Sequence, residues 1–437
     1  MPPLSPPPVS FALGTYLALT AALSPLAPVL LRRRLARGKE DAARLPERLG
    51  HPTRPRPDGP LVWFHAASVG ESLSLLPLVA AVLDARPDAH ALVTSGTRTS
   101  ADLLATRLPP RARHAFVPLD TPGPVRRFLN HWRPDVAVWT ESELWPRLVT
   151  ATHARAIPML LVNARMSAAS AARWRRAPRM LAGMLARFEA VQAQDAATAE
   201  LLARHAPDPA RIAVAGSLKE GAAPPPAEPG ALAALRTSIG ARPVWLAAST
   251  HPGEEEIVAE AHAFLLRARP DLLLILAPRH PDRAPEVAAI LAAAGLAAPR
   301  RSTGALPAPD APAYLADTLG EMGLWYRLAP VAFVGGSLVP VGGHNPYEPA
   351  ALGATIVTGP HTGNFAEIFA RLEAAGGALC APNADALAAA IATLLDNPAP
   401  TRDAARAVAT ADSGATTAAR AAILARLPAS DAGAPAP

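Results

Sequence analysis

Short apolar runs alternate with longer amphipathic stretches along most of this 437-residue chain. Such alternation is typical of βαβ units, in which helices join buried strands that lie parallel in one sheet. Strands covered by helices on both faces are near-continuously apolar. The expected strands are 61–65, 89–94, 114–119, 136–139, 158–163, 190–194 and 212–216, then, after a break, 244–248, 272–277, 331–335 and 355–358. The pattern predicts two doubly wound parallel α/β domains.

A Pro-rich stretch divides this pattern. Residues 221–230 read GAAPPPAEPG, which we expect to form neither a helix nor a strand ladder but a linker. The expected division is an N-terminal segment (1–40), a first α/β domain (41–220), a linker (221–240), a second α/β domain (241–427) and a disordered tail (428–437). Ligands of such sheets bind beyond the carboxyl ends of the strands, so we expect a cleft between the two domains.

Charge and cysteine content exclude several classes of protein. The chain has 42 Lys and Arg against 36 Asp and Glu, a formal net charge of +6. This modest excess suits an anionic ligand or surface, but it does not indicate a nucleic-acid-binding protein. The single cysteine, Cys380, excludes an internal disulfide framework and a multi-cysteine metal site.

The N-terminal segment contains an uncharged run at 9–31, long enough to cross a hydrocarbon core of about 30 Å. The basic residues that follow it are Arg32, Arg33, Arg34, Arg37 and Lys39. A basic cluster after the run predicts a retained anchor with the next domain on the cytoplasmic side, and not a secretory signal. Pro25 and Pro28 leave an interfacial or re-entrant anchor open. A buried helix of a soluble domain is the remaining alternative.

The first candidate site follows the first expected strand, in the string HAASVGES at 65–72. Gly70 permits a tight turn, and Glu71 then falls in the first turn of the next helix. A carboxylate there complements the helix dipole, which is a purely structural role. It could also act as a general base toward an acceptor hydroxyl if burial or a neighbouring carboxylate raises its pKa.

A second candidate lies in TESELWP at 140–146, again where a strand meets a helix. Thr140 or Ser142 could simply cap that helix. Glu141 and Glu143 are two acids among tryptophans at the carboxyl end of a strand. One of them could position a base or a bound hydroxyl.

Cations also follow several of the expected strands. They are Arg165, Lys219, His251, Arg279 and His280. Any one of these is more often a solvated end-cap than a ligand. If they converge on one cleft, they would suit an anionic and phosphorylated substrate.

The glycine-rich stretch 335–348 is the fourth candidate. Its glycines would let backbone amides approach a phosphate, and the helix beginning near Asn345 has free N–H groups. Glu348 could accept from ribose hydroxyls, or it could be the acid of a capping box. The sequence has no Walker lysine motif and no acidic pair that calls for Mg²⁺. We therefore expect chemistry that needs no metal and no cofactor, with cations and helix ends stabilising a leaving phosphate.

In their order along the chain, these motifs resemble those of the 3-deoxy-D-manno-oct-2-ulosonic acid (Kdo) transferases of lipopolysaccharide synthesis. The matching strings span roughly residues 30–375 and are HAASVGES, TESELWP, NARMS, GSLK, ASTHPGEE, APRHPDR, LGEMGLWY and FVGGSLVPVGGHNPYEPAALG. Ser142 stands where Thr is usual and Tyr347 where Leu is common, and neither change replaces a charged group.

The resemblance implies a GT-B glycosyltransferase with two Rossmann-like domains, the first for the acceptor and the second for the donor. It implies CMP-Kdo as the donor and a lipid A precursor, lipid IVA, as the acceptor. It also implies an N-terminal anchor in the inner membrane, with the catalytic domains on the cytoplasmic side.

The resemblance also assigns residues to roles in an inverting transfer. Glu71 would be the proton acceptor, and Glu141 and Lys219 would stabilise the transition state. Glu141 is preferred to Glu143 because it matches the first acid of the family's ETELWP-like string, and the choice between them stays open. The residues that would bind CMP are Pro278, Arg279, Gly320, Glu321, Met322, Asn345, Pro346, Tyr347 and Glu348.

Two other classes of protein share this architecture, because a fold does not fix a function. One is another nucleotide-sugar-dependent GT-B enzyme, either a different glycosyltransferase or a sugar-nucleotide 2-epimerase. The other is a membrane-tethered binding protein without turnover, against which the retained Glu71, Lys219 and Glu348 argue.

Overall fold

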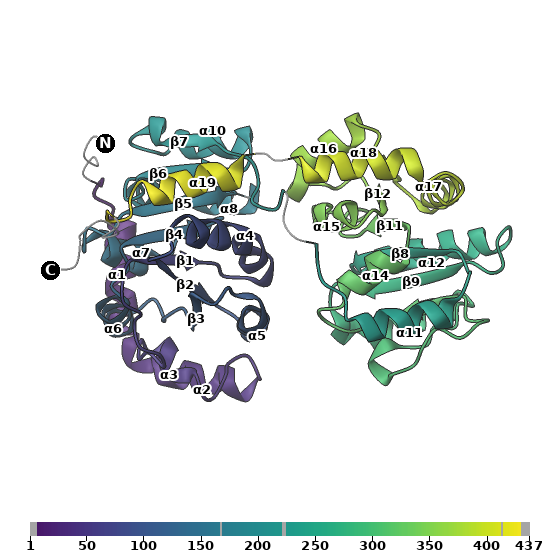
Figure 1. Cartoon of the computed structure of the whole chain (residues 1–437), viewed down its shortest axis with the longest axis horizontal. Helices are drawn as coiled ribbons and strands as arrows, with labels where there is room; N and C mark the ends of the chain where they lie inside the picture. The colour runs from purple at the N-terminus through teal and green to yellow at the C-terminus, as the bar shows by residue number, and fades with distance from the viewer. Residues whose placement is uncertain (1–6, 167, 221–223, 412–413, 430–437) are drawn as a thin grey trace. The chain divides into compact units, whose positions relative to one another are not determined.

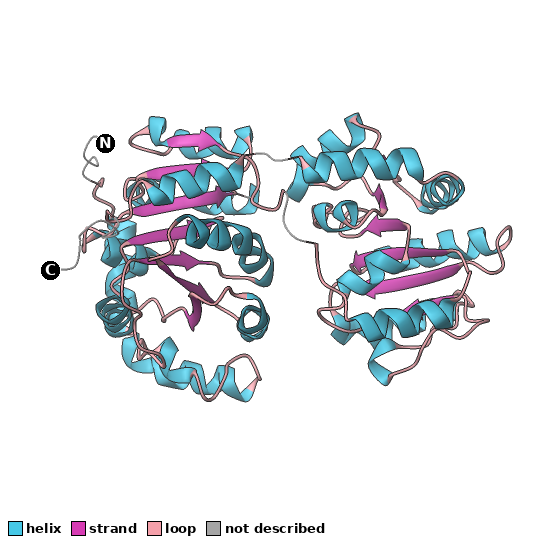
Figure 2. Cartoon of the chain, viewed as in Figure 1, coloured by secondary structure: helices cyan, strands magenta, loops and turns pink. Residues whose placement is uncertain are grey.

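The computed structural model describes residues 7–166, 168–220, 224–411 and 414–429. They form two compact units (Figure 1). The N-terminal unit takes in Met1–Ala222 and Asp412–Pro437, and the C-terminal unit takes in Ala223–Ala411. Each unit is a parallel sheet between helices (Figure 2), which confirms the predicted fold class.

The described part of the N-terminal unit has the strand order β3-β2-β1-β4-β5-β6-β7, and neighbouring strands are parallel. Its strands are β1 (Leu61–His65), β2 (His90–Ser95), β3 (Ala112–Phe116), β4 (Val136–Thr140), β5 (Met159–Ala164), β6 (Ala190–Ala193) and β7 (Ile212–Val214). In β1, Leu61 and Trp63 belong to the core on one face, and Val62 and Phe64 to the core on the other. Both faces are buried, as the apolar runs predict.

The described part of the C-terminal unit has the parallel strand order β10-β9-β8-β11-β12-β13. Its strands are β8 (Val244–Thr250), β9 (Leu273–Pro278), β10 (Ala313–Leu315), β11 (Val331–Val334), β12 (Thr355–Thr358) and β13 (Ala378–Cys380). The four expected strands are confirmed. The sequence did not indicate β10 or β13, because three residues are too few to show a periodic pattern.

Helices cover both sheets (Figure 2). In the N-terminal unit they are α1 (Phe11–Ala22), α2 (Ala27–Ala36), α3 (Leu45–Arg48), α4 (Val69–Ala85), α5 (Arg98–Arg107), α6 (Pro122–Trp132), α7 (Pro146–His153), α8 (Ala168–Trp174), α9 (Pro178–Leu185), α10 (Ala196–Ala203) and α19 (Ala415–Leu424). In the C-terminal unit they are α11 (Pro229–Ile239), α12 (Glu254–Leu266), α13 (Ala284–Ala293), α14 (Met322–Leu328), α15 (Tyr347–Ala351), α16 (Ala366–Ala374), α17 (Ala384–Asp396) and α18 (Ala399–Thr410).

The expected linker at 221–240 is wrong for most of its length, because α11 begins at Pro229. Proline at the first helical position costs no hydrogen bond and presets the helical φ. The Glu228 side chain caps the helix by accepting from the N–H groups of Gly230, at 2.8 Å, and Ala231. The Pro-rich string is therefore a helix start as well as a connection. Its residues 221–223 lie outside the described residues.

The C-terminal end of the second domain also differs from the expected 241–427, because α19 belongs to the N-terminal unit. In Figure 1 it is the yellow helix over β5 and α4. Ala419 and Ile423 share an apolar core with residues of α4, and Arg426 forms a 2.7 Å ion pair with Glu189. Residues 430–437 of the expected tail lie outside the described residues.

The N-terminal apolar run forms α1, a short 3₁₀ turn (Ser24–Leu26) and α2. Among the described residues, no single helix reaches the length and hydropathy of a membrane span. The helical stretches Phe11–Ala22 and Ser24–Ala36 together reach that length and hydropathy, but the chain bends by 47° between them. One face of α1 is held to the unit, because Tyr16 donates to Asp120 at 2.8 Å and Arg147 donates to Thr20 at 2.9 Å. The exposed apolar side chains of the segment are Val9, Phe11, Leu19, Leu23, Leu26, Val29 and Leu30.

A buried ionic network joins the end of this segment to the sheet. The Glu40 carboxylate, 1% exposed, accepts from Arg34 at 2.6 Å and from Arg48 at 3.0 Å. Arg48 also donates to the carbonyls of Val117, at 3.0 Å, and Gly96. A buried carboxylate and guanidinium are stable here because each has several partners.

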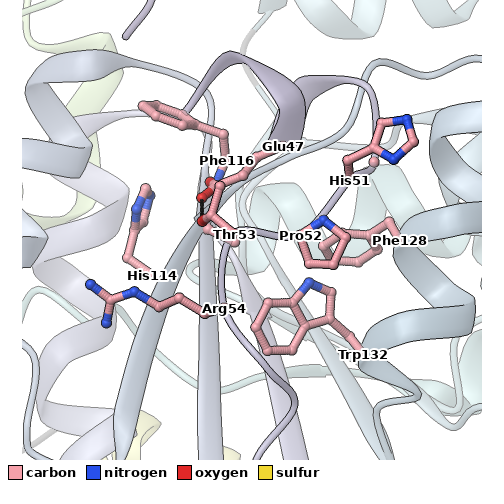
Figure 3. Close-up of a pocket in the computed structure, with 11 residues that line it drawn as sticks. Glu47, His51, Pro52, Thr53, Arg54, His114, Phe116, Phe128 and Trp132 are labelled. Atoms are coloured by element: carbon pink, nitrogen blue, oxygen red, sulfur yellow. Dashed lines mark hydrogen bonds between the residues drawn. The ribbon is translucent and has the colours of Figure 1, made fainter. Parts of the chain in front are cut away.

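A small pocket lies beside this network, at the β3 edge of the sheet (Figure 3). Glu47, which lines it, accepts from Arg44 at 2.9 Å, from the Phe116 N–H at 2.7 Å and from the Thr53 hydroxyl. Both carboxylate oxygens are therefore used within the fold. The pocket contains none of the candidate site residues.

Replacing Arg48 by methionine should destabilise the N-terminal unit by about 3–5 kcal/mol, because the buried Glu40 then loses a partner and two carbonyls lose their donor. Hydrogen exchange of β1–β3 peptides during urea denaturation measures this change. The control is Arg98→Met, which removes an exposed 3.8 Å ion pair with Asp102 and should leave the midpoint unchanged. An equal midpoint for both variants would contradict the assigned role of the network.

Candidate functional site

Three of the expected catalytic residues meet at the carboxyl edge of the N-terminal sheet. Glu71 follows β1, Glu141 follows β4, and Lys219 lies on the segment after β7. β1 and β4 are neighbours, so the residues that follow them begin side by side. Lys219 Nζ contacts Glu141 Oε1 at 3.1 Å, and the charge of Glu141 acts on Glu71. The three side chains form one charged group within a single unit.

Glu71 is held by a capping box at the start of α4. The Ser68 hydroxyl accepts from the Glu71 N–H at 3.3 Å and donates to Glu71 Oε1 at 2.6 Å. The Ala67 N–H donates to Oε2 at 2.8 Å, and the Thr140 hydroxyl lies 3.4 Å from the same oxygen. The structural role expected of a first-turn acid is therefore present, and the carboxylate is fixed in one position.

The same position perturbs the acidity of Glu71, which is 7% exposed. Burial raises the pKa of its carboxyl, and the neighbouring Glu141 carboxylate raises that pKa further. The hydrogen bonds from Ser68 and Ala67 act in the opposite direction and leave a net increase. A carboxylate with a raised pKa is a stronger base than an ordinary glutamate, so it is suited to accept a proton from a bound hydroxyl.

Glu141 adopts a backbone conformation that is uncommon for a residue with a side chain. Its φ is 52°, in the left-handed region, and its N–H donates to the Val162 carbonyl at 3.3 Å. Such a conformation persists only where the surrounding structure enforces it, and it is frequent at functional sites. The side chains of Glu141 and Lys219 are 19% and 14% exposed, so solvent can reach this ion pair.

Glu143 has a different environment. The Trp145 indole donates to Glu143 Oε2 at 2.8 Å, which holds this acid within its own turn. The charge of Glu143 also contributes least among the causes that raise the pKa of Glu71. Of the two acids, Glu141 is therefore the one whose charge acts more strongly on Glu71. Ser142 donates its hydroxyl to the carbonyl of Arg165, which ties the β4 and β5 ends together.

Asn163 belongs to this site, although the sequence analysis selected only Arg165 from the NARMS string. Asn163 is 2% exposed and has a φ of 53°. Its Oδ1 accepts from the Leu218 N–H at 3.0 Å, and its carbonyl accepts from Gln194 Nε2 at 3.0 Å. Asn163 thus positions the segment that carries Lys219. An asparagine near the end of a buried apolar strand was the available signal, since Asn tolerates the left-handed region.

The residues expected to bind CMP lie in the C-terminal unit. Pro278 ends β9 and is buried, while Arg279 is exposed and its N–H donates to the Thr250 carbonyl at 3.0 Å. Gly320, with a φ of 84°, turns the chain after β10, and Glu321 forms a 2.7 Å ion pair with Arg301.

Asn345 caps α15 in the same unit. Its Oδ1 accepts from the Tyr347 N–H at 3.0 Å, and its Nδ2 donates to Glu348 at 3.3 Å. Met322 and Pro346 flank α14 and α15 at their starts. All of these residues follow β9, β10 or β11, so they gather at the carboxyl edge of the C-terminal sheet.

Glu254 is a further residue that the sequence analysis missed. It is 0% exposed and accepts from four backbone N–H groups, those of His251, Gly336, Ser337 and Leu338, at 2.6–2.9 Å. The glycine-rich loop after β11 is therefore folded around one buried carboxylate. Within the described ranges, no group of three or more His, Cys, Asp and Glu side chains is arranged to hold a metal ion.

The electrostatic link between the two acids is testable. Glu141→Gln removes a negative charge and should lower the pKa of Glu71. A ¹³C NMR titration of the Glu71 carboxyl carbon measures this shift. Glu143→Gln is the matched control and should lower the pKa less. Equal shifts in the two variants would remove Glu141 as the neighbour that acts on Glu71.

Comparison with known proteins shows the same family over most of the chain. Residues 43–222 match the family model described as 3-deoxy-D-manno-octulosonic-acid transferase (kdotransferase). A 3-deoxy-D-manno-octulosonic acid transferase of Bordetella pertussis is 38% identical over 92% of this chain and 96% of its own length. The enzyme of that name from Haemophilus influenzae is 37% identical over 81% of this chain and 84% of its own length.

A solved structure agrees in fold. The glycosyltransferase of Rickettsia africae ESF-5 matches with a TM-score of 0.58 over 85% of this chain and 98% of its own, at 14% identity. At that identity the match concerns the fold alone, and it is the GT-B fold. The two sequence relatives, in contrast, are more than 30% identical over most of the chain. The chain therefore belongs to the 3-deoxy-D-manno-octulosonic acid transferase family of glycosyltransferases.

Proposed function

We propose that this protein transfers Kdo from CMP-Kdo to a lipid A precursor, lipid IVA, with inversion at the anomeric carbon and release of CMP. The observation that carries the proposal is the fixed, buried Glu71 carboxylate, whose pKa is raised, beside the Glu141–Lys219 ion pair. A transferase that makes a glycosidic bond needs such a base, because a sugar hydroxyl is a poor nucleophile until its proton leaves.

In the proposed step Glu71 accepts the proton of the acceptor hydroxyl. The hydroxyl oxygen then bonds to the anomeric carbon of Kdo, and the bond from that carbon to the phosphate oxygen breaks. The bonding electrons leave with CMP, and Glu71 keeps the proton. Glu141 and Lys219, which form a 3.1 Å ion pair, stabilise charge that develops during the transfer.

The donor half of the proposal concerns the C-terminal unit. CMP would contact Pro278, Arg279, Gly320, Glu321 and Met322, together with the segment from Asn345 to Glu348. Arg279 is exposed at the carboxyl edge of that sheet, where a guanidinium can pair with a phosphate. The α15 helix is too short to bind an anion by its dipole alone, so the proposal relies on these side chains and the glycine-rich loop.

Glu71→Gln tests the proposed base. Glutamine can still form the capping box, so the fold should be kept, but it cannot accept the proton. Turnover should fall by about 10²–10⁴-fold, while the affinity for CMP in calorimetry stays the same. The assay is mass spectrometry of the product from purified protein, CMP-Kdo and a tetraacylated lipid A precursor.

The matched control for this test is Glu143→Gln, which keeps an oxygen acceptor for Trp145 and should retain most of the activity. Near-normal turnover of Glu71→Gln would exclude Glu71 as the base. A wild-type protein that accepts UDP-sugars in place of CMP-Kdo would instead favour another nucleotide-sugar enzyme on the same fold.

We also propose that the protein is held at the cytoplasmic side of the inner membrane by its N-terminal segment. The Tyr16 and Arg147 contacts hold α1 to the unit, while Phe11 and Leu19 of the same helix are exposed. This arrangement favours a segment lying in the interface over one crossing the bilayer. Exposed arginines Arg173, Arg175 and Arg176 lie by α9, which α1 contacts, and could bind lipid phosphates.

Membrane binding should depend on the exposed apolar side chains of the N-terminal segment. The double variant Leu23→Glu with Leu26→Glu places two charges on residues that are 57% and 58% exposed, so it should not disturb the core. Binding to vesicles of phosphatidylethanolamine and phosphatidylglycerol, measured by co-sedimentation, should fall at least tenfold, a loss of about 1.4 kcal/mol or more. The control is Phe264→Glu, at an apolar side chain 56% exposed in the C-terminal unit. Undiminished binding by the double variant would contradict the proposal.

A further inference from the structure

Two histidines of the C-terminal unit are in direct contact. His251 follows β8, and His344 lies in the glycine-rich loop after β11. Their Nε2 atoms are 2.8 Å apart, and their rings are nearly parallel, at 12°. Parallel neighbouring strands β8 and β11 bring the two residues to the same edge of the sheet.

This contact limits how many protons the pair can carry. One Nε2 must donate and the other must accept, so a single proton lies between them. A further proton on the accepting Nε2 would set two N–H groups against each other, and the contact would then have to open. Opening would leave two N–H donors at the same edge, which is the arrangement that an oxyanion accepts from.

The surroundings of the pair are mostly cationic. The charged groups that act on His251 are Glu254, His280, Arg279 and Arg283, and His344 is faced by His251, Arg279 and His280. The His280 ring lies edge-on to His251 with centroids 5.9 Å apart. Arg283 is itself paired with Glu255 at 2.8 Å and with Glu286 at 2.9 Å.

Among the charged groups of the described residues that act on the two histidines, Glu254 is the one carboxylate. Four backbone N–H groups already donate to it. Burial lowers the pKa of both imidazoles, and that of His344 falls to about 4 with its cationic neighbours contributing. The free pair is therefore neutral near pH 7. An anion beside it would reverse the effect of those neighbours and raise the pKa of the pair.

We propose that His251 and His344 form a proton-linked receptor for an oxyanion, which opens and takes up a proton when a phosphate or carboxylate group binds. Only the identity of the natural ligand rests on the proposed function, because CMP-Kdo carries both a phosphate and a carboxylate group. Proton uptake at this site would supply a hydrogen-bond donor that stabilises negative charge on the departing phosphate without any metal. The pair touches the anion and takes no part in removing the acceptor proton.

The test is calorimetry of the full chain with the methyl ester of CMP, in buffers of different ionisation enthalpy. Its phosphodiester does not titrate near neutrality, so any proton taken up belongs to the protein. An opposite charge raises a pKa by about 1–3 units, which takes the pKa of His344 from about 4 to about 5–7. We therefore expect an uptake of about 0.2–0.9 proton per site at pH 5.5, declining toward pH 8.5. Cytidine should cause no uptake, and inorganic phosphate and free Kdo show whether the phosphate or the carboxylate is the ligand.

The uptake should vanish in His344→Gln and in His251→Gln, and it should persist in His361→Gln, which changes an exposed histidine of the same unit. An absence of uptake in the wild type, or an equal uptake in His344→Gln, would overturn the proposal. The wild-type measurement decides the matter even if a variant fails to fold. Because Kdo transfer is measured separately, loss of this inference leaves the proposed function standing, and a failed transfer assay leaves the proton linkage intact.

Discussion

Both units depend on a buried acid that follows a central strand and accepts hydrogen bonds from the backbone around it. Glu71 comes after β1 and Glu254 after β8, each at the point where the strand order reverses. Glu254 accepts from four backbone N–H groups, so its charge is used to shape a loop. Glu71 accepts from one backbone N–H and from the hydroxyls of Ser68 and Thr140, and a second carboxylate nearby raises its pKa. A buried acid after a central strand is therefore structural in the C-terminal unit and suited to proton transfer in the N-terminal unit.

The sequence was sufficient for the strands and the fold class, because strands buried on both faces stand out as apolar runs. It was insufficient where the partner of a segment lies far away in the chain. The alanine-rich helix α19 gives no local indication that it packs on α4, more than 300 residues earlier. The start of α11 was missed because Pro229 can be read as a helix breaker or as the first residue of a helix, and capping by Glu228 decides between these readings.

The candidate sites also contain residues that the sequence indicates and residues that it does not. Glu71, Glu141 and Lys219 could be named as candidates because charged residues that come shortly after apolar strands lie at the carboxyl edge of a parallel sheet. The family resemblance then selected them as the catalytic residues. The positioning residues could not be selected in this way. Asn163 acts through a backbone with φ of 53° and a bond to the Leu218 N–H, and Glu254 acts through amides 82–84 residues away. Those contacts exist only after folding.

Because α19 packs in the N-terminal unit, this protein cannot be divided at one point in the sequence. An N-terminal fragment that stops at residue 220 would lack Ala419 and Ile423, and the apolar surface of α4 that they cover would face water. A self-sufficient N-terminal unit would therefore need a fusion of two pieces that are distant in the gene, with a short connector replacing the entire C-terminal unit. The C-terminal unit, in contrast, is one uninterrupted insertion and can be expressed as a single stretch.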